Sequence, residues 1–550
     1  MERPTPNRGR RTASAVLAAA LVLGGAAVAR PAVADAPAPA PAPASAGVGS
    51  FRLADIPAKD GVVLKADVFT PAPGTPWADP QGRYPLVVQP ASWGQNDLEY
   101  VAQGRALAAE GYVVVTYTVR GFWGSGGEVD VAGPKDVADI STVIDWALAH
   151  TPADPDRVGM IGLSLGGGLT LLGAAYDSRI KAVASLSGWA DLTDSLYSGQ
   201  TRHLQAAAVL AGIQAPTGRK SPEFARVLDD LFADRDLPGV IDWADARSPA
   251  RHLDRINANG TAVLMANAWG DSFFNPSQVT DFYQRLTVPK RLELRPGDHA
   301  SQEFTGLLGL DNATWNSARS WLDQYVKGAP AADTRTQPVQ LDVRPSGSTE
   351  SHADWQSVSS RSERLAIGAD DLAAAVPGDP AAADWRTTVL GGTPSGASGG
   401  VALLSGLVDQ TVHQPPTVVV PLLARPAAVV RQSQPYPRGL SLRGGARVHT
   451  TVTATSPQGT VVAYLYDVDA LGIGRLVSHA PQSWSGRAPG QPFPLDVPLF
   501  ATAYDLPAGH RLALVLGTRD ALYGGETPLG SRVTFGSSAA DPATLTLPVR

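Results

Sequence analysis

The sequence predicts an α/β domain followed by an all-β domain, and three observations support this order. The chain has 550 residues, more than one hydrophobic core usually organises, so two or three folded units are expected. Over residues 50–330 strand-like apolar runs alternate with stretches of helical spacing, whereas over residues 336–550 short alternating strands with Gly and Pro turns dominate. Hydrophobic residues make up 44% and charged residues 17%, which is typical of globular proteins and excludes a fibrous chain.

Residues 1–34 predict a secretory signal peptide. Four arginines lie within the first 11 residues, an apolar run covers residues 13–29, and Ala32-Val33-Ala34 supplies the small residues of a cleavage site. A membrane anchor is the alternative, but the run is short and rich in Ala for a spanning helix. We expect cleavage after Ala34 and a secreted, extracellular protein that no membrane retains. Arg10-Arg11 leaves the twin-arginine export route open.

Residues 35–49 are rich in Ala and Pro and predict an extended linker. Several functional classes are excluded for the whole chain. No cysteine is present, so disulfides, thiolate metal sites and a cysteine nucleophile are ruled out. The net charge is -6 and the basic residues form no stripe, which argues against nucleic acid as a partner. No metalloprotease, phosphate-loop or dinucleotide motif occurs, so no cofactor and no metal is implied.

The elements of the first domain follow one another in a regular order. Strands are predicted over residues 62–69, 85–89, 112–116, 158–161, 262–267 and 291–294, and helices over residues 100–110 and 136–149. The first of these helices ends at Gly111, where a stop is expected. Such alternation indicates a mainly parallel sheet with helices on both faces.

Residues 188–254 interrupt this alternation and predict a helical cap over the sheet. The segments 204–210 and 224–232 have helical spacing. The acidic residues of the cap could bind a substrate ammonium group or form a solvated helix face, and charge on a helix usually faces water. These residues are Glu223, Asp229, Asp230, Asp234 and Asp236.

The pentad Gly162-Leu163-Ser164-Leu165-Gly166 ends a predicted strand and leads into an apolar helical stretch. A nucleophilic serine at the edge of a sheet sits on a sharp strand-to-helix turn, where the flanking residues must be small. An ordinary glycine-rich turn is the alternative in a chain with 56 Gly, but the strand before and the helix after favour a nucleophile. We therefore predict that Ser164 is the nucleophile of an α/β-hydrolase fold.

Chain order selects the partners of Ser164, because in this fold the carboxylate and then the histidine follow the serine. Of nine histidines, His299 alone lies after the candidate acid and within the first domain. Asp271, which follows the strand over residues 262–267, is predicted to orient its imidazole. Asp298 is the competing acid, and we expect it to support the loop, while Asp281 is expected to be solvated on the next helix.

Acyl transfer also needs two donors for the oxyanion. The backbone N–H of Leu165, the residue after the nucleophile, is the first candidate. The second is expected from residues 90–94, which include Trp93 and follow the strand over residues 85–89. A simple turn with a buried tryptophan is the alternative for this loop.

Four segments of the first domain look like the cocaine-esterase and X-prolyl dipeptidyl-peptidase family of serine hydrolases. They are Arg120-Gly121-Phe122-Trp123-Gly124-Ser125-Gly126-Gly127, the pentad around Ser164, Trp269-Gly270-Asp271 and Gly297-Asp298-His299. Near the C-terminus, residues 464–469 and 506–512 resemble the jelly-roll-like β-sandwich domain of these enzymes. The resemblance implies hydrolysis of an ester or amide bond through an acyl-enzyme, with a small ester, amide or peptide substrate. Members often carry a tyrosine where Trp93 stands, so whether its indole or its backbone donates is open.

Three functions are compatible with these residues. The leading one is an X-Pro dipeptidyl-peptidase-like hydrolase, which needs an acidic pocket for the substrate amine. A carboxylesterase without peptidase activity needs only an apolar acyl pocket. A non-catalytic exported binding protein is the third, and the complete set Ser164, Asp271 and His299 in the right order argues against it. Residues 467–472 are similar to the start of a calcium loop, but they lack its later ligands and predict a hairpin.

Overall fold

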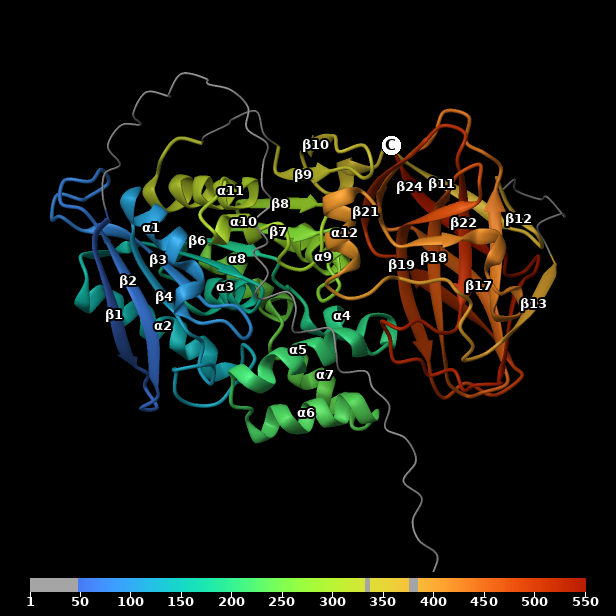
Figure 1. Ribbon diagram of the computed structural model, residues 1–550, viewed down its shortest axis with the longest axis horizontal. Coiled ribbons are helices and arrows are strands. Elements are labelled where there is room, and N and C mark those ends of the chain that lie inside the picture. The colour runs from blue at the N-terminus through green and yellow to red at the C-terminus, as the bar shows by residue number, and fades with distance from the viewer. Residues whose placement is uncertain (1–47, 332–336, 375–383) are drawn as a thin grey trace, which may run out of the picture.

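The computed structural model describes residues 48–331, 337–374 and 384–550, which form two packed domains (Figure 1). The predicted signal peptide over residues 1–34 and nearly all of the predicted linker lie outside the described residues. The described chain begins directly in a strand, β1 Val48–Pro57, so the sheet starts before the predicted end of the linker at residue 49.

A ten-stranded sheet forms the first domain, in the order β1-β2-β4-β3-β5-β6-β7-β8-β9-β10. Its centre, from β4 through β9, is parallel, and antiparallel pairs lie at the edges. The strands after β1 are β2 Val63–Pro71, β3 Tyr84–Pro90, β4 Val113–Tyr117, β5 Ala153–Leu163, β6 Ile180–Leu186, β7 Ala262–Ala268, β8 Lys290–Arg295, β9 Val339–Asp342 and β10 Thr349–His352. The mainly parallel sheet is confirmed.

Strands β9 and β10 correct the domain boundary that the sequence predicts at residue 336. β9 pairs in parallel with β8, and Val339 and Leu341 are fully buried in the same core as Leu292. The first sheet therefore extends to His352. Alternating polarity predicts a strand but carries no information on which sheet that strand joins, and this is why the boundary was placed too early.

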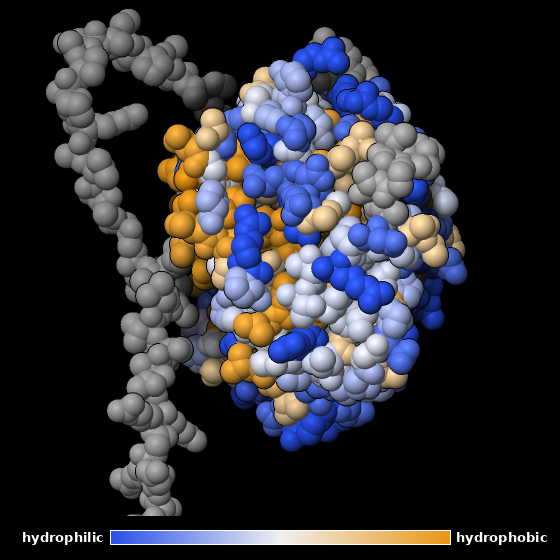
Figure 2. Space-filling model, turned by 90° about the vertical axis from the view of Figure 1, so that its right-hand side faces the viewer, coloured by the Kyte–Doolittle hydropathy of each residue, from blue (hydrophilic) through white to orange (hydrophobic). Residues whose placement is uncertain are grey.

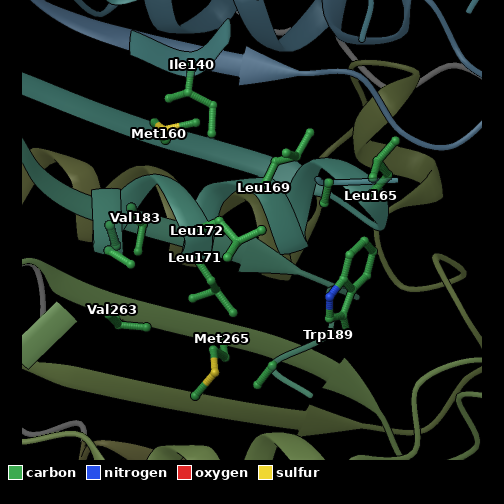
Figure 3. Packing of buried hydrophobic residues seen from close by; sticks show 14 of the residues in the cluster. Ile140, Met160, Leu165, Leu169, Leu171, Leu172, Val183, Trp189, Val263 and Met265 are labelled. Carbon is green, nitrogen blue, oxygen red and sulfur yellow. The ribbon is translucent and has the colours of Figure 1, made fainter. Parts of the chain in front are cut away.

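Helices cover both faces of this sheet, as expected. On one face α1 Val101–Ala109 and α11 Ala313–Leu322 pack around Trp315. The other face carries α2 Pro134–His150, α3 Leu165–Tyr176, α8 Leu253–Asn259 and α9 Pro276–Arg285. Figure 3 shows leucines of α3, among them Leu169 and Leu172, packed between Ile140 of α2 and the strands. Each such fully buried side chain stabilises the fold by roughly 1.5–3 kcal/mol.

The region predicted as a cap, residues 188–254, folds into helices that lie below the sheet in Figure 1. They are α4 Leu192–Tyr197, α5 Leu204–Thr217, α6 Pro222–Ala233 and α7 Leu237–Asp245. Ser221 caps the N-terminus of α6 by accepting from the backbone N–H of Phe224 at 3.1 Å. Phe224, Val227 and Leu231 recur at helical spacing and are buried on one side of α6.

A second sheet of 14 strands forms the all-β domain at the right of Figure 1. Its strands are β11 Arg361–Ile367, β12 Asp371–Ala374, β13 Trp385–Leu390, β14 Thr417–Val419, β15 Ala428–Ser433, β16 Leu440–Gly444, β17 Arg447–Ala454, β18 Gly459–Val468, β19 Ile473–Trp484, β20 Pro492–Pro498, β21 Thr502–Leu506, β22 Arg511–Gly517, β23 Arg532–Ser537 and β24 Thr544–Val549. Val533 of β23 and Leu514 of β22, which lie six strands apart in the order of the sheet, share one core, so the sheet folds over itself. A helix, α12 Ser405–Val412, interrupts the strands.

Part of the surface is apolar. Figure 2 shows hydrophobic side chains gathered along one edge of the face that the all-β domain presents. Exposed apolar residues of this domain include Val401, Leu404, Val412, Leu422 and Leu471. Within the ranges that the structure describes, no helix has both the length and the hydropathy needed to span a bilayer.

Candidate active site

Ser164 stands on a sharp turn between β5 and α3. Its backbone has φ 57° and ψ −116°, a conformation that costs energy for a residue with a side chain. A Cβ atom at Gly162 would overlap the carbonyl group of Gly166, and one at Gly166 would overlap the carbonyl oxygen of Pro90. The two glycines of the pentad are therefore required by close packing of the backbone around the serine.

Ser164, His299 and Asp271 form one hydrogen-bonded chain. The Nε2 atom of His299 lies 2.7 Å from Oγ of Ser164, and its Nδ1 atom lies 3.1 Å from Oδ2 of Asp271. With Nδ1 protonated, the imidazole donates to Asp271 and accepts from the Ser164 hydroxyl. This is the tautomer in which His299 can take the serine proton.

Asp271 is held in place by backbone donors. Its Oδ1 atom accepts from the N–H groups of Phe273 at 2.9 Å and Phe274 at 2.8 Å, which leaves Oδ2 for His299. The carboxylate is fully buried, with 0% of its side chain exposed. The rings of Phe273 and Phe274 also contact the imidazole, so the pair is shielded from water.

The surroundings of His299 favour its charged form. Burial alone would lower its pKa, but the negative charge and hydrogen bond of Asp271, with smaller contributions from Asp298 and Glu303, outweigh burial and raise the pKa above its ordinary value. Glu303 is buried and accepts from the Ser187 hydroxyl at 3.1 Å. Its own burial raises the pKa of Glu303 to about 7.

Asp298 lies beside the base but does not contact its ring. Its Oδ1 atom accepts from Ser272, through the backbone N–H at 2.9 Å and the hydroxyl at 2.7 Å, and from the backbone N–H of His299 at 2.8 Å. The residue therefore joins the acid loop to the base loop, as expected of a supporting residue. Asp281, the third carboxylate considered, is exposed on α9.

The two residues that are predicted to bind the oxyanion have unpaired backbone N–H groups among the described residues. Those of Leu165, at the first position of α3, and of Trp93 donate to no atom of the described residues. The indole N–H of Trp93 is occupied, because it donates to the carbonyl oxygen of Leu210 in α5 at 2.8 Å. Of the two alternatives for Trp93, the backbone donor is thus the one that the geometry leaves available.

The loop that carries Trp93 is anchored to the strand that carries the nucleophile. The Ser92 hydroxyl donates to the carbonyl oxygen of Leu163 at 2.9 Å, and the Leu163 N–H donates to the Tyr100 hydroxyl at 3.0 Å. The N–H of Ser92 donates to Glu99 at 2.8 Å. These bonds hold the loop against the turn that ends in Ser164.

A pocket opens at Ser164 and Leu165 under the cap. Its cavity volume is about 90 Å³. Cap helices supply most of its wall, Trp189 lies at the start of the cap region, and Trp93 and Phe274 come from the loops after β3 and β7. None of the side chains that line it is an acid, a lysine, an arginine or a histidine.

The acidic residues of the cap lie outside this pocket. Asp230 faces Arg235 at 3.3 Å, Asp234 faces Arg202 at 3.6 Å, and Asp236 accepts from the N–H of Gly239 at the start of α7. Glu223 is exposed and lies 3.6 Å from Arg247, and Asp229 is exposed. They form the solvated face that the sequence analysis gave as the alternative to an ammonium-binding site, and several of them are also paired with arginines.

The pocket wall is the part of the site that sequence reasoning missed. The side chains Phe224, Val227, Leu228 and Leu231 of α6 line it. Their spacing, at positions i, i+3, i+4 and i+7, was visible in the sequence and predicts an apolar helix face. The helical periodicity of the sequence does not show whether this apolar face of α6 covers Ser164 or packs into the core.

The segment over residues 120–127 has a structural role. Arg120 is buried and holds Asp139 through two hydrogen bonds of 2.7 Å. The indole N–H of Trp123 donates to the carbonyl oxygen of Gly94 at 2.8 Å, and its backbone N–H donates to Thr217 at the end of α5. The segment thus ties the loop of Trp93 to the cap.

The structure offers no metal centre in the part of the chain it describes, since no group of three or more His, Cys, Asp or Glu side chains lies close enough to hold an ion. The segment over residues 467–472 lies where β18 turns into β19. Asp469 accepts from the N–H groups of Leu471 and Ile473 at 3.0 Å, which is the hairpin that its sequence predicts.

Two family models match the chain. Residues 60–301 match the model described as X-Pro dipeptidyl-peptidase (S15 family), and residues 327–543 match the X-Pro dipeptidyl-peptidase C-terminal non-catalytic domain. The first match lies within the first domain, and the second covers most of the all-β domain together with β9 and β10 of the first sheet.

Three solved structures share the architecture over both domains. An α-amino acid ester hydrolase has a TM-score of 0.71 and 17% identity and covers 95% of this chain and 100% of its own. A CocE/NonD family hydrolase from Staphylococcus aureus has a TM-score of 0.69 and 14% identity, with 91% and 94% covered. An aminopeptidase from a marine sediment archaeon, Thaumarchaeota archaeon, has a TM-score of 0.67 and 16% identity, with 94% and 99% covered. They confirm the α/β-hydrolase fold with a C-terminal all-β domain.

Curated relatives match shorter stretches. A protein from Escherichia coli, described as an uncharacterized 31.7 kDa protein, is 34% identical over 116 residues, which are 21% of this chain and 40% of the relative. An uncharacterized peptidase from Bacillus subtilis is 32% identical over 143 residues, which are 24% of this chain and 21% of the relative. The chain thus spans two fifths or less of the length of these two relatives.

Proposed function

The chain belongs to the X-Pro dipeptidyl-peptidase (S15) family of serine-type hydrolases through both of its folded domains, and we propose that it hydrolyses carboxylic esters with an apolar acyl group. Ser164 is the nucleophile in this proposal, His299 the base and then the acid, and Asp271 the residue that orients His299. The 2.7 Å and 3.1 Å separations along the three side chains support these roles.

The reaction passes through an acyl-enzyme. The Oγ atom of Ser164 attacks the ester carbonyl carbon while Nε2 of His299 takes the hydroxyl proton. The carbonyl electrons move onto oxygen, and the free N–H groups of Leu165 and Trp93 donate to that oxyanion. The oxyanion collapses, the bond to the alcohol oxygen breaks, and His299 gives its proton to the departing alkoxide. Water then repeats the same steps on the acyl-enzyme and releases the acid.

The uncharged pocket is the observation that favours an ester with an apolar acyl group. Leucine, valine and aromatic side chains of the cap surround the space next to Ser164, and no carboxylate lines it. A free α-ammonium group placed there would lose its hydration without gaining a partner, which costs several kcal/mol. A neutral acyl chain gains roughly 25 cal/mol for each Å² of apolar surface that it buries.

Removal of X-Pro dipeptides is the second candidate, and the description of the matching family model favours it. Such a substrate carries a free amine, which calls for a carboxylate near the nucleophile. The acidic residues of α6 and of the start of α7 do not line the pocket, and most of them lie within 4 Å of an arginine. Ester hydrolysis is therefore the first candidate function, and removal of X-Pro dipeptides is the second.

The test compares the purified protein with its Ser164→Ala variant, and Ser346→Ala, at an exposed serine of the β9–β10 turn, is the matched control. A fluorophosphonate probe should label the protein and the control but not Ser164→Ala. p-Nitrophenyl butyrate and hexanoate should be better substrates than Gly-Pro and Ala-Pro p-nitroanilides. A higher kcat/KM for the prolyl anilides would replace ester hydrolysis by the peptidase function. If the fluorophosphonate probe still labels Ser164→Ala, Ser164 is not the nucleophile.

We also propose export, on the basis of residues 1–34. Loss of this segment removes five Arg and one Glu, so the net charge would change from -6 to -10. Expression of the full chain in a secreting bacterial host tests the proposal. A protein in the medium that begins at Asp35 is the expected result, and an intact N-terminus on cell-bound protein would contradict it.

A further inference from the structure

Helix α12 of the all-β domain lies against the two loops that carry the acid and the base. Figure 1 draws it at the junction of the two domains, beside the ends of β7 and β8. Gly406 and Asp409 are buried on the side of α12 that faces the first domain, whereas Leu404 and Val408 are exposed. The helix is thus a contact between the all-β domain and the candidate active site.

Backbone donors near the start of α12 contact both loops. The N–H of Gly406 donates to Oδ2 of Asp298 at 3.2 Å, and the N–H of Leu403 donates to the Ser272 hydroxyl at 2.9 Å. Ser272 follows Asp271, and its hydroxyl donates in turn to Oδ1 of Asp298, the residue before His299. One network therefore links α12, the acid loop and the base loop.

The packing at this junction leaves no room for a side chain at Gly406. A Cβ atom at Gly406 would lie 2.6 Å from the carbonyl oxygen of Gly297 and 2.7 Å from Cβ of Asp298. The N–H of Gly270 donates to the same carbonyl oxygen of Gly297 at 3.1 Å. Leu403 has φ 65°, a strained conformation that the surrounding contacts must offset. The start of α12 is therefore in close contact with both the acid loop and the base loop.

We propose that Gly406 and Asp298 are positioning residues of the triad, so that the all-β domain, through α12, sets the distance between Asp271 and His299. The proposal rests on the proposed function, because it concerns how these two residues act on Ser164. It assigns the C-terminal domain a part in the reaction without any contact with substrate.

Gly406→Ala tests the proposal, because its methyl group would push Asp298 and Gly297 away from α12. We expect a fall in kcat and in the rate of fluorophosphonate labelling of about 10- to 100-fold, with KM for p-nitrophenyl butyrate nearly unchanged. Gly474→Ala in β19 is the matched control. Its methyl group would press on Val420 at 2.8 Å inside the all-β domain, so it should lower Tm and leave kcat unchanged below Tm.

Asp298→Asn is the second variant. If Gly406→Ala does not fold, this variant tests whether Asp298 is a positioning residue of the triad. The amide oxygen can still accept from Ser272, but the charge next to His299 is lost, so the acid limb of the kcat/KM profile should move to lower pH and kcat should fall. Wild-type rates and pH profiles in folded Gly406→Ala and Asp298→Asn would overturn the proposal. Unlabelled wild-type protein would instead mean that the proposed function itself has failed.

Discussion

The indole N–H of Trp93 donates to the carbonyl oxygen of Leu210 at 2.8 Å, so this side chain joins the loop after β3 to cap helix α5. The ring also packs edge-on against Phe224 of α6, with centroids 5.8 Å apart. Trp93 therefore forms part of the pocket wall, its indole N–H is occupied, and its backbone N–H has no partner among the described residues.

Trp93→Phe should change substrate binding more than the chemical step. The variant keeps the backbone donor and loses one neutral hydrogen bond, worth about 0.5–1.5 kcal/mol, between loop and cap. We expect KM for p-nitrophenyl hexanoate to rise several-fold and kcat to change by less than about threefold. An indole that served the oxyanion would instead cost about 100- to 1,000-fold in kcat when removed. Trp123→Phe, which loses the bond to Gly94 on the same loop, is the control.

Gly166→Ala should destabilise the protein and abolish activity. Its methyl group would overlap the carbonyl oxygen of Pro90, so the turn that carries Ser164 must move. Overpacking of this kind costs typically about 1–3 kcal/mol in unfolding free energy. Gly212→Ala, at an exposed position of α5 with open space around it, is the matched control and should stabilise by about 0.5–1 kcal/mol. Urea denaturation measures both, and equal stability of the two variants would contradict the packing argument.

Asp271→Asn should lower kcat by about 10⁴-fold, because an amide can favour the wrong tautomer of His299. The wild-type kcat/KM should rise with pH through a pKa above the ordinary histidine value, since Asp271 raises the pKa of His299 and the neutral imidazole is the base. In the variant this acid limb should move to lower pH. Asp281→Asn on the exposed side of α9 is the control, and a loss of activity there as large as in Asp271→Asn would refute the assignment of the acid.

Glu303 should make the protein less stable as pH rises. Burial raises its pKa from 4.5 to about 7, so the folded state keeps a proton that the unfolded state has already lost. The stability that this proton contributes is complete below pH 4.5 and is lost as pH rises to about 7. Urea unfolding at pH 5 and pH 7.5 should show a smaller decrease for Glu303→Gln than for the wild type. Identical pH dependence of the two proteins would show that Glu303 titrates normally.

Local patterns predicted the elements of the first domain well, and their errors have a common cause. A short apolar run identified the strand that became β3, and the helical stretch after it became α1, with ends shifted by a residue or two. Strand β1 was missed because its Arg52 and Asp55 interrupt the apolar pattern at a sheet edge that is largely exposed. Strand β9 was assigned to the wrong domain, since its pairing with β8 depends on contacts distant in sequence.

The sequence by itself determined the parallel sheet, the turn around Ser164 and the choice of Asp271 and His299, because periodicity, small flanking residues and chain order are local or one-dimensional properties. Only the tertiary structure decided that α6 lines an uncharged pocket, that the Trp93 indole binds the cap and that α12 contacts Asp298. Each of these depends on which surfaces meet when distant segments pack. Which surfaces meet depends on the shape of the whole fold and on which side chains it buries, and the sequence of a single segment does not determine either.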